Sequence, residues 1–420
     1  MKHLIKYMSL VGILLVSSHL QAQDSDILST YLTEAAENNP DVKASFQRYY
    51  AALERVPQVG ALPDPKAMIG YFILPVETRV GPRRFDVQLS QAFPWFGTLA
   101  AKEDQASKEA EAQYQVFLKT KNDLFYQVKE AYYQLYIIDK SISITRGYLD
   151  ILARDERVSL NRVEAGKATT ADVLRIQMEI KERTAELESF VDKRQSVAAR
   201  LNALLNREVN EELSVSQEIM ADSVQSQYTA LIDSVLLHNP EINRFRKQQE
   251  ALDSKIKVAQ KSGRPSFSLG LSYANVTPRT DTEMNIPGDG QDMLMPMATV
   301  SIPLFRKKYR AMVDEATFQK NSLQQDILNV ENQLQSNLVA AINQYRDAQR
   351  NLNLYGELTQ QANQTLNILT EAYVGGEEDY EEVLRIEQQL LRYQLGLEKA
   401  KAEVNIAVAL IDKLLAKNIQ

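Results

Sequence analysis

Two long segments of the chain carry hydrophobic residues at the spacing of an α-helix. One segment has Leu124, Val128, Ala131, Leu135 and Ile138, and the other has Leu323, Ile327, Val330, Leu334 and Leu338. Residues that recur every three or four positions lie along one face of a helix. No proline interrupts residues 95–239 or 304–420, and both stretches are rich in strong helix formers. The pattern therefore predicts very long helices, and one that ran from Gly97 to Gly166 would be roughly 100 Å long.

A glycine followed by a short polar turn interrupts each helical region. Gly166 precedes Asp172-Val173-Leu174, and Gly376 precedes Glu382-Val383-Leu384. Glycine readily takes the left-handed conformation that ends a helix, and acidic residues favour the first turn of the next one. We therefore predict that residues 163–174 and 373–384 are the tips of two antiparallel helical hairpins, each continued by a returning helix.

The segments that do contain proline show strict alternation of apolar and polar residues instead. In the clearest case Phe267, Leu269, Leu271 and Tyr273 alternate with Ser266, Ser268, Gly270 and Ser272. Alternation over about ten residues is typical of a transmembrane barrel strand, with one face toward lipid and the other toward the lumen. Strands are expected at about 66–75, 84–93, 266–275 and 296–303, with turn-rich loops at 76–82 and 276–295. Because about eight strands are the practical minimum for a barrel, and open sheet edges are not tolerated in lipid, the chain must oligomerise.

The chain repeats its own landmarks. Asn39-Pro40 recurs 200 residues later as Asn239-Pro240. Phe93-Pro94-Trp95-Phe96 corresponds to Ile302-Pro303-Leu304-Phe305, and the two tip elements are 210 residues apart. Similar offsets in the same order indicate an internal duplication. We expect two structural repeats, residues 23–220 and 221–420, each consisting of helix, strand, loop, strand, long helix, tip and returning helix.

The first 22 residues have the features of a secretory signal peptide. Lys2 and Lys6 precede a short apolar run from Met8 to Val16, and Ala22 is a plausible residue before the cut. The run is too short for a membrane-spanning helix, and no other stretch is long and apolar enough. The protein is therefore predicted to be exported.

Composition argues against catalysis. The chain has no cysteine and three histidines, of which His3 and His19 lie in the predicted signal peptide. Zinc chemistry and Ser-His or Cys-His mechanisms are therefore poorly supported, and we predict neither an enzyme nor a cofactor. A formal net charge of −7 also argues against nucleic acid as a partner.

With these duplicated elements, the mature chain resembles the TolC-type outer-membrane factors of bacterial efflux and secretion systems. The resemblance implies a mainly α fold with a small β part, in which a homotrimer forms a twelve-stranded outer-membrane barrel above a helical tunnel in the periplasm. It also implies a passive conduit in contact with outer-membrane lipid. The implied protein partners are a periplasmic adaptor (a membrane fusion protein) and an inner-membrane pump of the resistance-nodulation-division type.

By the same resemblance, the tips are the adaptor-docking end and the periplasmic entrance. The docking positions would be Gly166, Val173, Leu174, Gly376, Val383 and Leu384. The entrance residues would be Asp172, Glu382, Glu378, Asp379 and Arg385. Arg385 stands where the family can carry a second carboxylate, so a Glu382–Arg385 interaction can replace a double acidic ring. The alternative is that these carboxylates only complement the helix dipoles at solvated helix starts.

Methionines provide the only hint of a metal site. Met284, Met293, Met295 and Met297 cluster in the second loop and its following strand, with Met68 on the first strand. Thioethers bind Cu(I) and Ag(I), but methionine is also an adaptable apolar filler. The sequence looks nearest to relatives of metal-efflux pumps, which makes metal ions the first expectation for cargo.

Three other functions stay open at this point. The duct could carry drugs and other small organic molecules, or proteins in type I secretion. A soluble periplasmic coiled-coil adaptor would also show helical hairpins, but the alternating strand pairs and the lack of a β-rich lipoyl-like segment disfavour it.

Overall fold

The computed structural model describes residues 24–224, 228–280, 287–376 and 378–417. The predicted signal peptide lies outside these residues. The chain is mainly helical with one four-stranded antiparallel sheet, as its sequence predicts, and it divides into two compact units. The first unit contains Met1–Ser45, Phe117–Pro240 and Glu331–Gln420, and the second contains Phe46–Val116 and Glu241–Val330.

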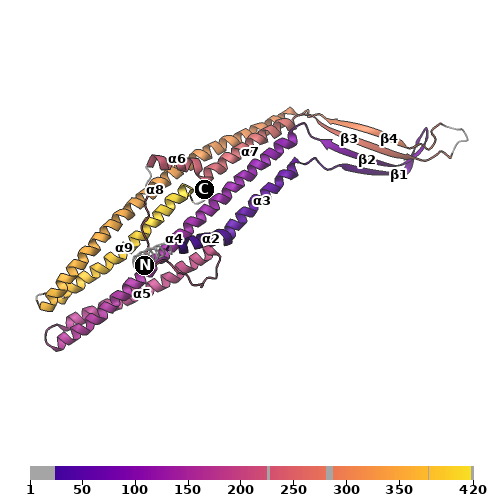
Figure 1. Ribbon diagram of the computed structural model, residues 1–420. Helices are drawn as coiled ribbons and strands as arrows, with labels where there is room; N and C mark the ends of the chain where they lie inside the picture. The colour runs from indigo at the N-terminus through magenta and orange to yellow at the C-terminus, as the bar shows by residue number, and fades with distance from the viewer. Residues whose placement is uncertain (1–23, 225–227, 281–286, 377, 418–420) are drawn as a thin grey trace, which may run out of the picture. The chain divides into compact units, whose positions relative to one another are not determined.

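Figure 1 labels the elements in chain order. The helices are α2 (Asp24–Asn38), α3 (Pro40–Gly60), α4 (Thr98–Glu164), α5 (Thr170–Leu205), α6 (Tyr228–His238), α7 (Pro240–Ser262), α8 (Arg306–Gly375) and α9 (Tyr380–Leu414). The strands are β1 (Lys66–Thr78), β2 (Gly81–Phe93), β3 (Ser266–Val276) and β4 (Met293–Ser301). None of the helices among the described residues has a stretch long and apolar enough to cross a membrane.

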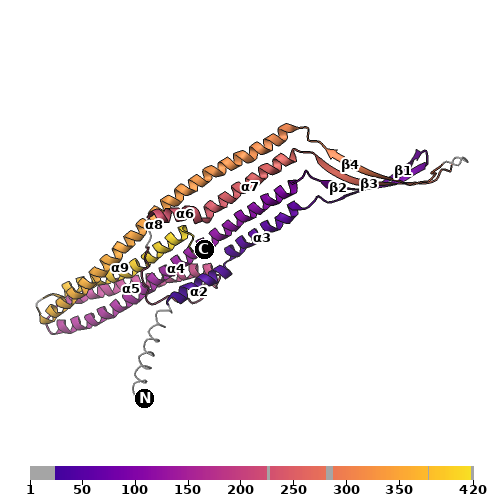
Figure 2. The same cartoon turned by 45° about the horizontal axis from the view of Figure 1, so that its top comes forward.

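The second unit contains the sheet, whose strands are paired in the order β1-β2-β3-β4 (Figure 2). The first loop is shorter than the alternation predicted. β1 continues to Thr78 and β2 begins at Gly81, because ladder pairing resumes at Val76↔Arg83 after an irregularity that contains Pro75. A bulge thus accommodates the proline that the sequence had assigned to a loop border.

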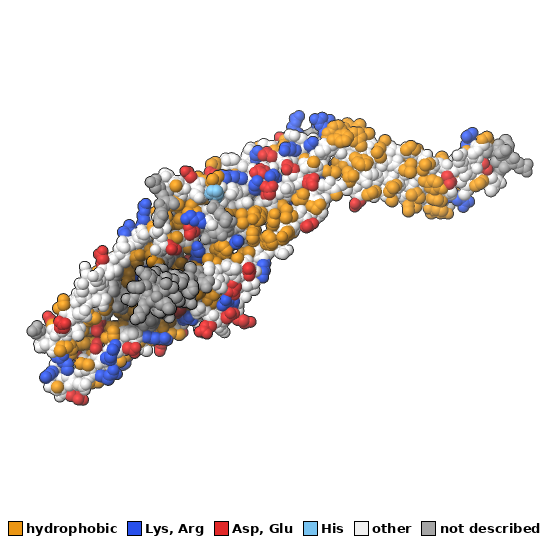
Figure 3. All heavy atoms as spheres, viewed as in Figure 1, with side chains coloured by type: hydrophobic (Ala, Val, Ile, Leu, Met, Phe, Trp, Pro, Cys, Tyr) orange, Lys and Arg blue, Asp and Glu red, His pale blue; other side chains and the backbone are white. Residues whose placement is uncertain are grey.

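The register separates two chemically different faces of the sheet. Val87 pairs with Tyr273 and Leu89 with Leu271, whereas Gln88 pairs with Ser272 and Ser90 with Gly270. Directly paired residues point to the same face, so one face is apolar and the other polar. Ile69, on the apolar face, is 77% exposed, and Leu294 is 66% exposed. Hydrophobic side chains gather over the strands in Figure 3, and such an exposed apolar band suits contact with lipid.

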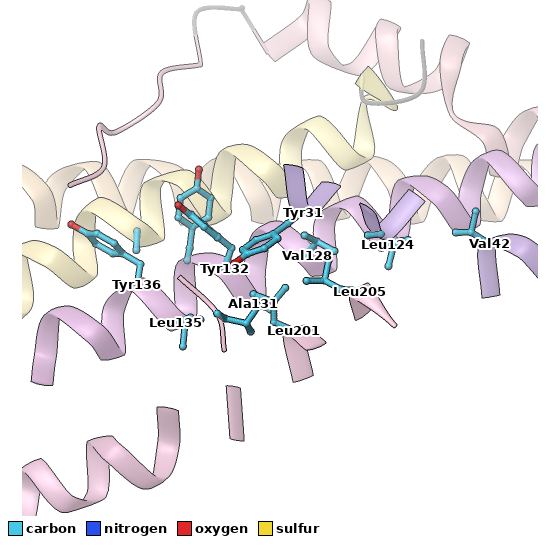
Figure 4. Packing of buried hydrophobic residues seen from close by; sticks show 14 residues of the cluster. Tyr31, Val42, Leu124, Val128, Ala131, Tyr132, Leu135, Tyr136, Leu201 and Leu205 are labelled. Atoms are coloured by element: carbon cyan, nitrogen blue, oxygen red, sulfur yellow. The ribbon is translucent and has the colours of Figure 1, made fainter. Parts of the chain in front are cut away.

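The first unit contains a hydrophobic core where α2, α3, α4, α5 and α9 meet (Figure 4). Tyr132 of α4 lies edge-on to Tyr31 of α2, with ring centroids 6.3 Å apart. Leu201 and Leu205 of α5 are fully buried against the same cluster. Here the tyrosines also anchor the segment after α5, since the Tyr132 hydroxyl donates to Ser216 Oγ at 3.0 Å.

The duplicated asparagines make the same contact twice. The Asn39 side chain donates to the Leu204 carbonyl at 3.0 Å, and the Asn239 side chain donates to the Leu414 carbonyl at 3.3 Å. Asn39 Oδ1 also accepts from the backbone N–H of Asp41 at 3.0 Å, so it caps the helix that Pro40 begins. Each asparagine therefore joins the start of one helix to the end of the returning helix of its own repeat.

Candidate functional site

The first hairpin tip is a glycine-capped turn between α4 and α5. Gly166 has φ +69, and the N–H of Lys167 bonds to the Arg162 carbonyl at 2.8 Å while that of Gly166 bonds to Val163 at 3.0 Å. These two bonds are the Schellman arrangement that ends a helix. No heavy atom lies within 4 Å of a Cβ built on Gly166, so the backbone angle alone requires glycine here.

The second tip, between α8 and α9, also has a glycine whose N–H bonds three residues back, from Gly376 to the Tyr373 carbonyl at 3.2 Å. Gly376 has φ +81, and its surroundings are equally open. Asp379 occupies the N-cap position of α9, and the exposed Glu378 precedes it. In both places a glycine of positive φ lies between one long helix and the next.

Two of the carboxylates expected at the entrance, Asp172 and Glu382, are engaged by neighbours. Glu378 and Asp379 are exposed, and the Asp379 side chain makes no cap hydrogen bond. Asp172 Oδ2 accepts from the Thr169 backbone N–H at 3.1 Å and from its hydroxyl at 2.8 Å. Asp172 Oδ1 also lies 3.3 Å from Arg175 Nη1. At the equivalent position of the second tip, Glu382 pairs with Arg385. Each tip thus has a carboxylate in the first turn of a helix, paired with an arginine three residues later. The negative charge of the carboxylate also interacts favourably with the dipole of that helix.

Of the expected docking residues, only some are accessible in the single chain. Leu174 is 54% exposed, but Val173, Val383 and Leu384 are buried. Val383 and Leu384 belong to a second hydrophobic cluster that also contains Leu152 of α4 and Ile176 of α5. They pack the two hairpins together beneath the tips.

Polar contacts join the two hairpins directly at this end. Tyr380 donates its hydroxyl proton to Asp155 Oδ2 at 2.9 Å. Arg162 lies over the Tyr373 ring, with 4.0 Å from its guanidinium carbon to the ring centroid. Arg175 Nη1 is 3.0 Å from Glu381 Oε2. These contacts connect α4 and α5 to α8 and α9.

A buried group of carboxylates lies among these contacts, and the sequence analysis did not identify it. Glu179 and Glu387 are 5% and 7% exposed. Glu179 accepts from Gln388 Nε2 at 2.8 Å and lies 3.1 Å from Arg183 Nε, so its charge is compensated. Among the described residues no cation forms an ion pair with Glu387, and its Oε2 is buried without a hydrogen-bond partner.

Burial, reinforced by the charges of Asp155 and Glu179, raises the pKa of Glu387 to about 8. Burial also raises the pKa of Asp155 and that of the Tyr380 hydroxyl. At neutral pH Glu387 therefore keeps its proton. A signal was present in the sequence, since Glu387 follows Val383 and Leu384 at helical spacing and precedes Leu391, on the apolar face of α9.

The described residues offer no group of three or more His, Asp or Glu side chains placed to hold a metal ion. Met293, Met295 and Met297 lie on β4 and Met68 on β1, whereas Met284 is outside the described residues. The described residues of the tip region thus combine glycine-ended helices, paired surface charges and one buried carboxyl group with a raised pKa.

Comparison with known proteins gives a family and a fold. The family model of outer membrane efflux proteins matches residues 31–207 and 231–417. The cobalt-zinc-cadmium resistance protein CzcC of Cupriavidus metallidurans is 21% identical over 391 residues, which cover 93% of this chain and 90% of CzcC.

Two solved structures with similar folds extend the comparison. The structure of CusC, solved in a study of transmembrane channel formation, is one of them. Its TM-score is 0.76 at 16% identity, over 93% of this chain and 92% of the CusC chain. The outer membrane protein VceC of Vibrio cholerae has a TM-score of 0.74 at 18% identity, over 94% of this chain and 97% of the VceC chain.

The raised pKa of Glu387 predicts a pH dependence of stability. Because the folded protein retains a proton that the unfolded chain releases above its ordinary pKa of 4.5, the free energy of unfolding should fall as pH rises from about 4.5 to about 8. Glu387→Gln keeps a neutral hydrogen-bonding side chain and should remove this part of the fall. The measurement is the thermal unfolding temperature across that pH range, by circular dichroism.

The matched control is Glu357→Gln, which changes an exposed glutamate of α8. The control should retain the wild-type pH dependence. An identical dependence in Glu387→Gln and the wild type would show that Glu387 ionises normally in the folded protein.

Proposed function

The chain belongs to the outer membrane efflux protein family, as its resemblance to the TolC-type factors implies, and we propose that it is the exit duct of a tripartite pump for metal ions. In this proposal an inner-membrane transporter of the resistance-nodulation-division type supplies the energy. A periplasmic adaptor connects that transporter to the duct, and the duct itself carries out no chemistry.

One observation carries the duct proposal: a four-stranded sheet with an exposed apolar face on one side and a polar face on the other. Its edge strands, β1 and β4, leave backbone donors and acceptors unpaired in the single chain, and such groups are not tolerated in lipid. Three copies joined β4 to β1 would give twelve strands in a closed outer-membrane barrel. The polar faces would then line the lumen.

Metal ions are proposed as cargo because CzcC is named for resistance to cobalt, zinc and cadmium. The paired charges at the tips support the proposal that these tips surround the periplasmic entrance. Around a three-fold axis, Glu382 and Asp172 would contribute carboxylates that favour cations. Glu378 and Asp379 would add further negative charge at the second tip.

Loss of the duct should make cells sensitive to metals. Deletion of the gene should lower the tolerated concentration of cobalt, zinc or cadmium, and a plasmid copy should restore it, while the protein should be recovered as a detergent-solubilised trimer from the outer membrane. Recovery from the soluble periplasm without detergent would contradict the duct. Unchanged metal tolerance together with increased sensitivity to organic antibiotics would instead assign small organic molecules as cargo.

At the entrance, Glu382→Ala should reduce the preference of the channel for cations over anions. The reason is that one carboxylate per protomer disappears while Arg385, its partner, remains. Single-channel recordings in planar bilayers measure the ratio of the two permeabilities. The control Glu357→Ala, far from the tip along α8, should leave the permeability ratio unchanged. An unchanged ratio in Glu382→Ala would show that Glu382 does not line the lumen.

The tip glycines allow a test of adaptor docking. Gly166→Val or Gly376→Val would force a β-branched residue to positive φ, which costs about 1–2 kcal/mol and distorts only the turn. We expect trimers to form, but co-purification of the adaptor and metal efflux should both decline. Gly147→Val and Gly356→Val are matched controls, because these glycines lie inside α4 and α8 with equally open surroundings and ordinary φ. Unaltered efflux in both tip variants would exclude the tips from docking.

A further inference from the structure

A pocket of about 450 Å³ lies at the end of the sheet where its strands meet the helices. Its lining comes from β2, β3 and β4 and from α4, α7 and α8, and all of the lining residues belong to the second unit. Apolar and basic side chains both contribute, and they include Phe93, Trp95, Ile302, Lys102, Lys261 and Arg264. One pocket thus offers an apolar wall together with positive charge.

The aromatic wall of the pocket continues the apolar face of the sheet. Phe93, Phe267 and Val300 form the last row of paired residues on that face. The indole of Trp95 stacks on Phe267, with ring centroids 6.0 Å apart, so it lies on the same side of the sheet. β3 has 11 residues, about the length that spans a bilayer. In the proposed duct Trp95 therefore lies at the level of the lipid headgroups, where tryptophan is enriched.

The basic side chains of the pocket have no carboxylate beside them. None of the described residues that line the pocket is acidic. Lys261 donates to the Phe96 carbonyl at 3.2 Å, which uses one of its three N–H donors. Thr98, also in the lining, is 5% exposed, and its hydroxyl is buried without a hydrogen-bond partner among the described residues. Positive charge and hydrogen-bond donors without a carboxylate suit an anionic ligand.

The beginning of α8 adds positive charge beside the pocket. Four of its first five residues are basic and exposed, namely Arg306, Lys307, Lys308 and Arg310. Arg306 donates to the carbonyl of Gly263 at 2.9 Å, next to the lining residue Arg264. Figure 3 shows basic side chains next to a hydrophobic patch where the helices meet the sheet. Because cations at a helix N-terminus oppose the helix dipole, these residues do not stabilise α8, and their charge points to an anion outside the chain.

We propose that this pocket binds the headgroup of an anionic phospholipid, with the phosphate facing Lys102, Lys261 and Arg264 and the acyl chains along the apolar face of the sheet. The inference rests on the proposed duct, because it requires the sheet in a bilayer and the helices in the periplasm. A basic pocket at the membrane boundary attracts anionic headgroups. Zwitterionic lipids carry no net charge to compensate the cations, so the pocket selects a lipid such as phosphatidylglycerol.

The fluorescence of Trp95 tests the site directly, because it is the only tryptophan of the chain. The purified trimer is reconstituted in phosphatidylcholine bilayers that contain increasing fractions of brominated phosphatidylglycerol or of brominated phosphatidylcholine, since bromine quenches a nearby indole. We expect phosphatidylglycerol to be preferred at Trp95 by about fivefold or more, the effect of one or more basic side chains at an anionic lipid. Equal quenching by the two lipids in an assembled trimer would overturn this inference alone.

Two double variants make the test specific. Lys102→Gln/Arg264→Gln removes two charges from the pocket and should lower the preference severalfold, while Lys261 keeps its bond to the Phe96 carbonyl. The matched control Lys181→Gln/Lys193→Gln removes two exposed lysines from α5, and it should retain the wild-type preference. An unchanged preference in the pocket variant would show that these cations do not select the lipid.

Inorganic phosphate separates a lipid site from a site for the free anion. At the molar concentration of the lipid and at constant ionic strength, phosphate should leave the preference unchanged, because it has no acyl chains to lie along the apolar face. Loss of the preference would show that the pocket binds free phosphate instead of a lipid. Failure to recover a trimer from the outer membrane, seen before any lipid is added, overturns the proposed duct rather than the pocket.

Discussion

The unpaired backbone groups at the two edges of the sheet are the constraint on which the function of this protein depends. In water these groups would bond to solvent, but in hydrocarbon each unsatisfied group costs several kcal/mol. The exposed apolar face, which includes Ile69 and Leu294, suits contact with the hydrocarbon of a bilayer. Because four strands cannot close on themselves, a neighbouring chain must satisfy the edges. The sheet edges can therefore be satisfied in a bilayer only within an assembly of several chains.

Much of this fold could be predicted from the sequence because its signals are local. Alternation placed the strands, and the glycines at 166 and 376 placed the tips to within a few residues. The buried carboxylates could not be placed in the same way. Asp155 and Glu387 lie on different hairpins, 232 residues apart in the chain, and periodicity says nothing about which helix faces meet. The short turn after Thr78 was missed for a related reason, since ladder pairing on both sides of Pro75 overrides the local preference of proline.

The two halves of the chain share contacts in the helical scaffold but differ where the tips meet. The Asn39–Leu204 contact recurs as Asn239–Leu414 with every partner displaced by 200 or 210 residues. By contrast, Glu387 corresponds to Gln177, and Asp155 corresponds to Thr365. The buried carboxyl groups of Glu387 and Asp155 therefore occur together once per protomer. A trimer of such chains has six similar helical hairpins, but only three sets of these buried carboxyl groups, related by three-fold symmetry.

The cross-hairpin contacts at the tips have a mechanical consequence. Within one protomer, the hydrogen bond from Tyr380 to Asp155, the stacking of Arg162 on Tyr373 and the shared apolar cluster all resist separation of the two hairpins. The pair of hairpins consequently behaves as a single stiff lever. In the proposed trimer, a partner that gripped one hairpin of a protomer would move the other hairpin with it. Three points of attachment would then be enough to displace all six tips.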